Sequence, residues 1–140
     1  MLAKSGYETR LIDLAILPAD ALLARRSAPE VDDALAAVGQ ARVVIAATPT
    51  YRALYTGLLK AFFDLMPSGC LYEKLCIAVQ TGGSSVHTLA VEYGLKPLFM
   101  SLDGIPAAGV YATDDEFVDG NPSAEVAARL ELALAMALLR

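Results

Sequence analysis

Two short polar segments contain the residues best suited to bind a ligand, and each directly follows an apolar run. Residues 43–47 form the run before the first segment, and residues 75–79 form the run before the second. An unbroken apolar run is typical of a strand buried in a parallel sheet, and open α/β sheets bind ligands at the carboxyl ends of such strands. Hydroxyls, turn amides and glycines that admit close approach favour binding there. The predicted binding residues are Thr48, Pro49, Thr50, Tyr51, Thr81, Gly82, Gly83 and Ser84.

Both segments also have a purely structural interpretation. The first can be a strand-to-helix turn in which Pro49 fixes the backbone and the adjacent threonines satisfy local amides. The second can be a glycine-rich turn in which Ser84 or Ser85 caps the next helix. The residues alone leave both alternatives open.

The sequence predicts no catalytic acid, base or nucleophile and no metal site. His87 is the one histidine, and it begins a predicted helix with no carboxylate placed to orient it. A packing role, or a place at the ligand's edge, is therefore favoured over proton transfer. Cys70 and Cys76 form no metal-binding or disulfide pattern, and Cys76 lies inside an apolar run, as a buried core thiol does.

Strands and helices are predicted to alternate along the chain, which favours a parallel sheet with helices on both faces. A helix is expected to end at Gly6, and an acidic run at Asp114, Asp115 and Glu116 is interpreted as a solvated loop. Pro97 is expected to kink or re-register its helix. The predicted strands are 8–14, 43–47, 75–79 and 105–111. The predicted helices begin at a capping box in Ser27–Glu30, near Leu58, near Val86 and, after Asn121 as N-cap and Pro122, at 123–139.

Composition limits the possible classes of protein. The chain has 140 residues, 56% of them hydrophobic, so we expect one domain spanning 1–140 with an extensive core. The formal net charge of −5 and the scattered basic residues argue against nucleic-acid binding. No apolar run is long enough to cross a membrane, and charges near Met1 interrupt any secretory leader, so a cytoplasmic protein is predicted.

Two longer motifs resemble the NADPH-dependent FMN reductases, which have a flavodoxin-like fold. The first motif is ATPTYRALYTGLLK at 47–60, and the second is TGGSSVH at 81–87 followed by LAVEYGLKP at 89–97. The second motif is similar to the branch that supplies reduced flavin to alkanesulfonate monooxygenases. The two motifs occur in the family's order, and the resemblance extends over nearly the whole chain from Glu8.

The resemblance implies FMN and NADPH as cofactors, hydride transfer between them, and a monooxygenase as a possible partner. It implies that Thr50 and Tyr51 lie beside the flavin ring and that the amides of 81–84 bind its polar edge. Arg52 is either a solvated charge or a phosphate contact. Tyr93 is either a core aromatic or a π-type bulge at a subunit interface, as in that branch. We expect a homo-oligomer, dimer or tetramer, that buries the helices around Tyr93 and 130–139.

The chain departs from the family pattern before Glu8, where the first strand and the phosphate-binding loop are expected to be missing. In the flavodoxin order, that strand lies between strands 8–14 and 43–47. We expect the sheet to close up by pairing these two strands, or to be completed by another copy, because open inner edges are costly. Two other functions stay open: a non-catalytic homologue that oligomerises or binds a partner, and an electron carrier.

Overall fold

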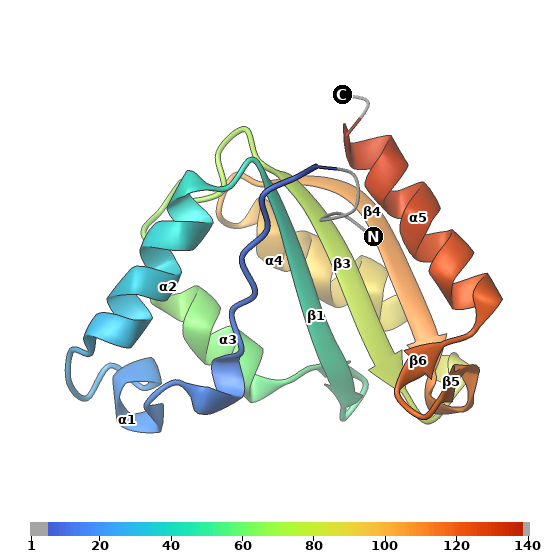
Figure 1. Ribbon diagram of the computed structural model, residues 1–140. Helices are drawn as coiled ribbons and strands as arrows, with labels where there is room; N and C mark the ends of the chain where they lie inside the picture. The colour runs from blue at the N-terminus through green and yellow to red at the C-terminus, as the bar shows by residue number, and fades with distance from the viewer. Residues whose placement is uncertain (1–5, 139–140) are drawn as a thin grey trace.

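A parallel sheet forms the centre of the computed structural model, which describes residues 6–138 (Figure 1). Strands β1 (Val43–Tyr51), β3 (Leu75–Gly82) and β4 (Ile105–Thr113) pair in parallel in that order. The short strand β2 (Leu54–Tyr55) adds an antiparallel pair to the end of β1, giving the order β2-β1-β3-β4. The predicted parallel α/β architecture is confirmed.

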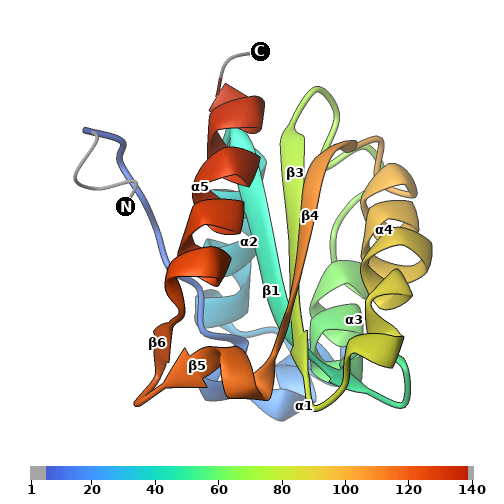
Figure 2. The same ribbon diagram turned by 90° about the vertical axis from the view of Figure 1, so that its right-hand side faces the viewer.

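Helices cover both faces of the sheet (Figure 2). One face is covered by α5 (Ala124–Leu138), and the other by α3 (Gly57–Asp64) and α4 (Lys96–Met100). The remaining elements are α1 (Ala19–Leu22), α2 (Pro29–Gln40), 3-10 turns at Leu14–Ile16, Ser85–His87 and Asp114–Glu116, a π-helix at Val91–Leu95, and the hairpin β5 (Phe117–Val118) with β6 (Asn121–Pro122).

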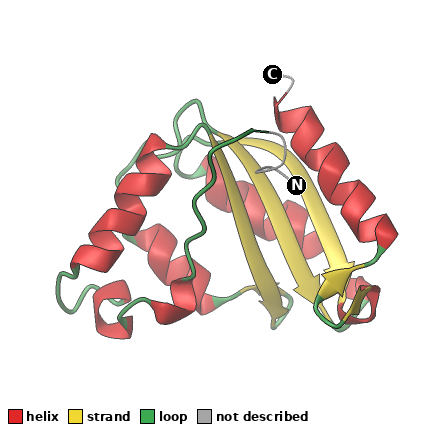
Figure 3. Cartoon of the chain, viewed as in Figure 1, coloured by secondary structure: helices red, strands yellow, loops and turns green. Residues whose placement is uncertain are grey.

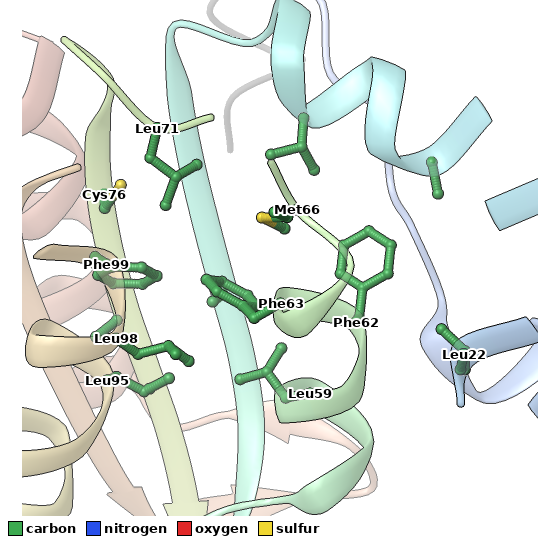
Figure 4. Packing of buried hydrophobic residues seen from close by; sticks show 14 of the residues in the cluster. Leu22, Leu59, Phe62, Phe63, Met66, Leu71, Cys76, Leu95, Leu98 and Phe99 are labelled. Carbon is green, nitrogen blue, oxygen red and sulfur yellow. The ribbon is translucent and has the colours of Figure 1, made fainter. Parts of the chain in front are cut away.

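The larger part of the core lies between the sheet and α3 and α4, and Figure 4 shows aromatic and branched side chains meeting there. Phe63 of α3 lies against Phe99 of α4, with ring centroids 6.0 Å apart. The face under α5 is built from smaller residues, including Ile77, Val110 and Ala133. Leu132 on α5 is 62% exposed, so the expected burial of 130–139 by another subunit stays a prediction.

Cys76 is buried in the core, as predicted, and this has a consequence at alkaline pH. Burial raises the pKa of its thiol from 9.0 to about 11. Because the pKa is raised in the folded state, the folded protein holds the thiol proton more tightly than the unfolded chain does. The free energy of unfolding is therefore highest below pH 9.0 and falls as the pH rises towards about 11. We expect wild-type protein to lose about 2–3 kcal/mol of unfolding free energy over this range relative to Cys76→Ala, at roughly 1.4 kcal/mol per pKa unit. Urea unfolding of both proteins at several pH values measures the difference, and parallel curves would contradict it.

Two predicted helix caps are wrong, one by a single residue and the other by two. Ala28, not Ser27, is the N-cap of α2; no side-chain cap forms, and Pro29 occupies the first turn. Asn121 and Pro122 lie in β6, paired with Val118 and Phe117 across a tight turn, so they cannot begin α5. The Ser123 hydroxyl accepts the Val126 amide at 3.2 Å and caps that helix instead.

The helix containing Pro97 is re-registered, as predicted. Residues Val91–Leu95 form a π-helix, and α4 follows with Pro97 in its first turn. The segment before it is not one helix from Val86, because Ser85–His87 form a separate 3-10 turn. Tyr93 is thus on a π-helix, with 78% of its surface exposed.

Residues 8–14 do not form the predicted strand. They are extended and mostly exposed as far as Asp13, with Leu11 93% exposed, and a 3-10 turn begins at Leu14 (Figure 3). An extended chain becomes a strand only when a neighbour supplies a hydrogen-bond ladder, and none does so here within residues 6–138. Gly6 has a φ of +80°, as a helix-capping glycine has, but the helix predicted before it lies outside the described residues.

The sheet does not close up by pairing this segment with β1. On the side of β1 opposite β3, the described chain supplies no strand partner except β2, which pairs only with Thr50 and Tyr51. Ile45, at the middle of that edge, is 41% exposed. The predicted direct pairing is wrong, and completion of the edge by another copy stays a prediction.

Candidate functional site

The two polar segments lie side by side at the carboxyl-terminal end of the parallel strands. Strands β1 and β3 are neighbours, and their register places Pro49 opposite Thr81. Because the strands are parallel, their carboxyl ends meet at the same edge. The sequence-based expectation that these segments come together is confirmed, whereas their contact with a ligand stays a prediction.

The first segment is not the predicted loop. Strand β1 continues through Tyr51 and turns back at once into β2. The two turn residues, Arg52 and Ala53, have φ values of 53° and 64°, as hairpin turns with the twist of strands require. The pairs Thr50–Tyr55 and Tyr51–Leu54 extend the β-structure past the expected end of the strand. Residues 50–55 form a short hairpin arm, on which the Tyr51 side chain is 66% exposed.

Thr48 connects the end of β1 to the start of α3. Its hydroxyl is 3.2 Å from the Thr56 hydroxyl and also accepts the Thr56 amide at 3.2 Å. The Thr56 side chain in turn accepts the Leu59 amide and caps α3. Thr48 is only 6% exposed, so its hydroxyl supports the first segment from the interior and is not itself on the surface.

The second segment divides between a strand end and a turn. Thr81 and Gly82 belong to β3, and the Ser84 side chain caps the 3-10 turn that follows. The Tyr111 hydroxyl donates to the Ser84 carbonyl at 2.9 Å and fixes the turn from below. A Cβ at Gly82 would lie 2.5 Å from that hydroxyl and 3.2 Å from Thr50 Cβ, so only glycine fits between them.

Gln80 joins the two segments from the interior. It is fully buried, and its Nε2 donates to Thr50 Oγ1 at 2.9 Å. Sequence analysis missed Gln80, and it also missed Tyr111. The available signal was an amide inside an apolar strand, because glutamine is rarely buried without a specific partner.

The acidic run at the end of β4 is more than a solvated loop. Glu116 accepts the Thr113 amide at 2.7 Å and pairs with Arg129 of α5. Chiefly because of that amide, the pKa of Glu116 lies below its usual range. Arg129 also donates to the Tyr111 carbonyl at 2.6 Å. Glu116 therefore joins α5 to the strand that supports the second segment.

An apolar groove lies beside the hairpin arm, between Leu54 and the segment that ends in the π-helix. Its lining includes Val86, Leu89 and Tyr93, together with His87, which is half-buried. A second hollow, between α1 and α2, is lined by none of the predicted binding residues. Residues 6–138 contain no cluster of His, Cys, Asp or Glu suited to a metal ion, and no helix there is both long and apolar enough to span a membrane.

Comparison with known proteins identifies the family. The sequence model of the NADPH-dependent FMN reductases matches residues 1–119. The chain belongs to this family. It is 38% identical over 131 residues to an NADH-dependent FMN reductase, SfnF, of Pseudomonas fluorescens, covering 90% of this chain and 70% of the relative. It is 36% identical over 122 residues to an FMN reductase (NADPH) of Escherichia coli, covering 86% of this chain and 64% of the relative.

The structure resembles solved members of the same kind. A crystal structure of the NADH:FMN oxidoreductase EMOB in its apo form superposes with a TM-score of 0.85 at 35% identity, covering 99% of this chain and 75% of that chain. The flavodoxin-like fold expected from the sequence is confirmed. The chain spans about two thirds of the length of the curated FMN reductases, with 70%, 66% and 64% covered in three of them.

Proposed function

We propose that this member of the FMN reductase family binds FMN against its two segments and transfers a hydride to it from a nicotinamide cofactor. The reduced flavin would then supply a monooxygenase. The observation that carries the proposal is that the ends of β1 and β3, which carry the two segments, are neighbours at the carboxyl-terminal end of the sheet. Pro49 and Thr81 face each other there, in a chain whose family is defined by this reaction.

The residues at this edge suit the flat ring of FMN. Gly83 is exposed, and the nearest atom to a Cβ built on it is Asp114 Oδ2, 3.5 Å away, so the missing side chain leaves room for a planar ligand to approach the backbone of this turn. The exposed Tyr51 ring and the half-buried Thr50 hydroxyl lie on the facing arm. In this proposal 81–84 bind the polar edge of the ring and Tyr51 lies beside it. A phosphate contact by Arg52, exposed at the hairpin turn, stays a prediction.

FMN supplies the hydride-accepting chemistry when bound, so the chain's own task is alignment. The segments orient the ring. The hydrogen bond from Gln80 to Thr50 joins the two segments, and the contact of Thr48 with Thr56 fixes the first segment to the start of α3. His87 lines the apolar groove, and the role proposed for it is packing or a place at the ligand's edge, not proton transfer.

The nicotinamide donor is proposed to be NADPH, the donor in the family's description. One relative is described as NADH-dependent and another as NADPH-dependent, so both donors belong in the test. We expect turnover with both and a lower KM for NADPH. A lower KM for NADH would reverse the assignment of the donor without affecting the flavin site.

The central experiment is a titration of the purified chain with FMN, followed by addition of the nicotinamide. We expect quenching of flavin fluorescence on binding, and then loss of nicotinamide absorbance as the flavin is reduced. Tight binding with no oxidation of NADPH or NADH would favour an electron carrier. If folded protein shows neither binding nor turnover, the proposal is contradicted and a non-catalytic oligomerising homologue is favoured. The observation that supports such a homologue is the edge of β1 that no strand within residues 6–138 covers beyond the short pairing with β2.

We also propose a homo-oligomer in which the groove beside Tyr93 packs against a second copy. Tyr93, Val86 and Leu89 are 78%, 76% and 61% exposed, and an apolar surface of this kind is typical of an interface. Tyr93→Ser is expected to weaken self-association at least tenfold, because buried aromatic anchors contribute most to such contacts. Light scattering across a dilution series measures the change.

Tyr72→Ser is the matched control, since Tyr72 is also a tyrosine with 64% of its surface exposed but does not line the groove. Equal behaviour of the two variants would contradict the interface. The monooxygenase partner and a cytoplasmic location likewise remain part of the proposal.

A further inference from the structure

Gln80 stands out as a polar side chain in an otherwise apolar part of the sheet. It has no exposed surface and lies in register between Thr48 of β1 and Tyr111 of β4. Residues 75–79 before it in the same strand are Leu, Cys, Ile, Ala and Val. Burying an amide costs free energy unless hydrogen bonds replace its contacts with water. A glutamine at this buried position therefore needs a specific hydrogen-bond partner.

That partner is the Thr50 hydroxyl, and the direction of the hydrogen bond matters. Gln80 Nε2 donates to Thr50 Oγ1 at 2.9 Å, so the oxygen is the acceptor. A hydroxyl carries one proton and two lone pairs. Because a lone pair of Thr50 is taken by Gln80, its proton is left to be donated in another direction.

The Thr50 hydroxyl lies where the two segments meet. Thr50 Oγ1 lies 3.3 Å from the position that a Cβ of Gly82 would occupy, and the Thr50 side chain is only half-buried. Gln80 Oε1, by contrast, has no hydrogen-bond partner among the described residues. The amide is thus held by its contact with Thr50 and not by a wider network.

We propose that Gln80 is a positioning residue that turns the Thr50 hydroxyl into a hydrogen-bond donor toward an acceptor atom on the edge of the bound flavin ring. This inference rests on the proposed function, because it deepens the role of the same site. It assigns the direction of one hydrogen bond and makes Gln80 act on the flavin only through Thr50.

A double-mutant cycle on FMN affinity tests the assignment. Gln80→Met keeps the length of the side chain and removes the donor, and Thr50→Val keeps the shape and removes the hydroxyl. Each single variant is expected to raise the Kd for FMN about tenfold, the size of one well-formed hydrogen bond. In the Thr50→Val background, Gln80→Met is expected to change the Kd less than twofold, because the residues act in series.

Gln80→Glu supplies a second and independent readout. A carboxylate oxygen can only accept, so it would draw the Thr50 proton inward and weaken FMN binding about tenfold at high pH. As the buried carboxyl takes up a proton at lower pH, it regains a donor, and the Kd is expected to recover towards the wild-type value. The Kd of wild-type protein measured over the same pH range is the reference for this recovery.

The outcomes separate this inference from the proposed function. If wild-type protein does not bind FMN, the proposed function fails. If it binds FMN but Gln80→Met is neutral, or weakens binding equally with Thr50 and with Val at position 50, Gln80 is only structural and the inference fails. Gln80→Glu that binds FMN with wild-type affinity at high pH would also overturn the inference. The Thr50 hydroxyl would then donate to the carboxylate at position 80, and FMN binding would not need its proton. Thermal unfolding confirms that each variant is folded, and Gln80→Glu serves if Gln80→Met is not.

Discussion

Gly82→Ala is expected to raise the Kd for FMN by about ten- to a hundredfold, the largest effect of any single methyl group at the site. The added Cβ would lie 2.5 Å from the Tyr111 hydroxyl and 3.2 Å from Thr50 Cβ. Overpacking of this kind costs about 1–3 kcal/mol, here by pushing apart the two segments that the proposal places around the ring. Fluorescence titration with FMN measures the loss.

Tyr111→Phe provides the test of this explanation, because it removes the oxygen atom nearest to the added methyl group. In the Gly82→Ala background it is expected to restore part of the affinity, although by itself it removes the hydrogen bond to the Ser84 carbonyl and weakens binding. Gly39→Ala in α2 is the control, because a Cβ built on Gly39 has no atom within 4 Å and the residue is not part of the site. Equal losses for the two glycines would argue against a steric origin.

Phe99→Ala is expected to lower the free energy of unfolding by about 3–5 kcal/mol, a large part of the total stability of a domain of this size. Phe99 has no exposed surface and packs against Phe63, so its ring joins α4 to α3 across the core. The variant would leave a cavity that this close-packed region cannot fill. Urea unfolding followed by circular dichroism measures the change.

Met100→Ala is the control, since Met100 is the next residue of α4 and is 62% exposed. Its effect is expected to stay within about 0.5 kcal/mol, as for most surface substitutions. A loss at Phe99 no larger than that at Met100 would mean that the α3–α4 contact contributes little to the fold.

Local patterns in the sequence were sufficient for much of the architecture. The apolar runs in β1, β3 and β4 indicate strands of a parallel sheet covered on both faces, although one face of β1 stays partly exposed at Ile45. The same runs place Pro49 and Thr81 at one edge, since parallel strands end together. Pro97 predicts a change of helical register because proline lacks the amide hydrogen that an α-helix needs. These features depend on the chain's own residues, so the sequence reveals them directly.

The tertiary structure decided what depends on a neighbour. Residues 8–14 have a sequence suited to a strand but no described strand to pair with, and hydrogen bonds between strands cannot be inferred from one strand alone. The hairpin at Arg52 and Ala53 replaced the predicted loop because pairing with β2 continued β1 to Tyr51. Gln80, Tyr111 and Thr50 meet only because three strands take one particular register. The sequence by itself determined the family, the sheet and the edge at which ligands are expected, whereas the buried polar contacts that shape that edge arise from packing between distant segments.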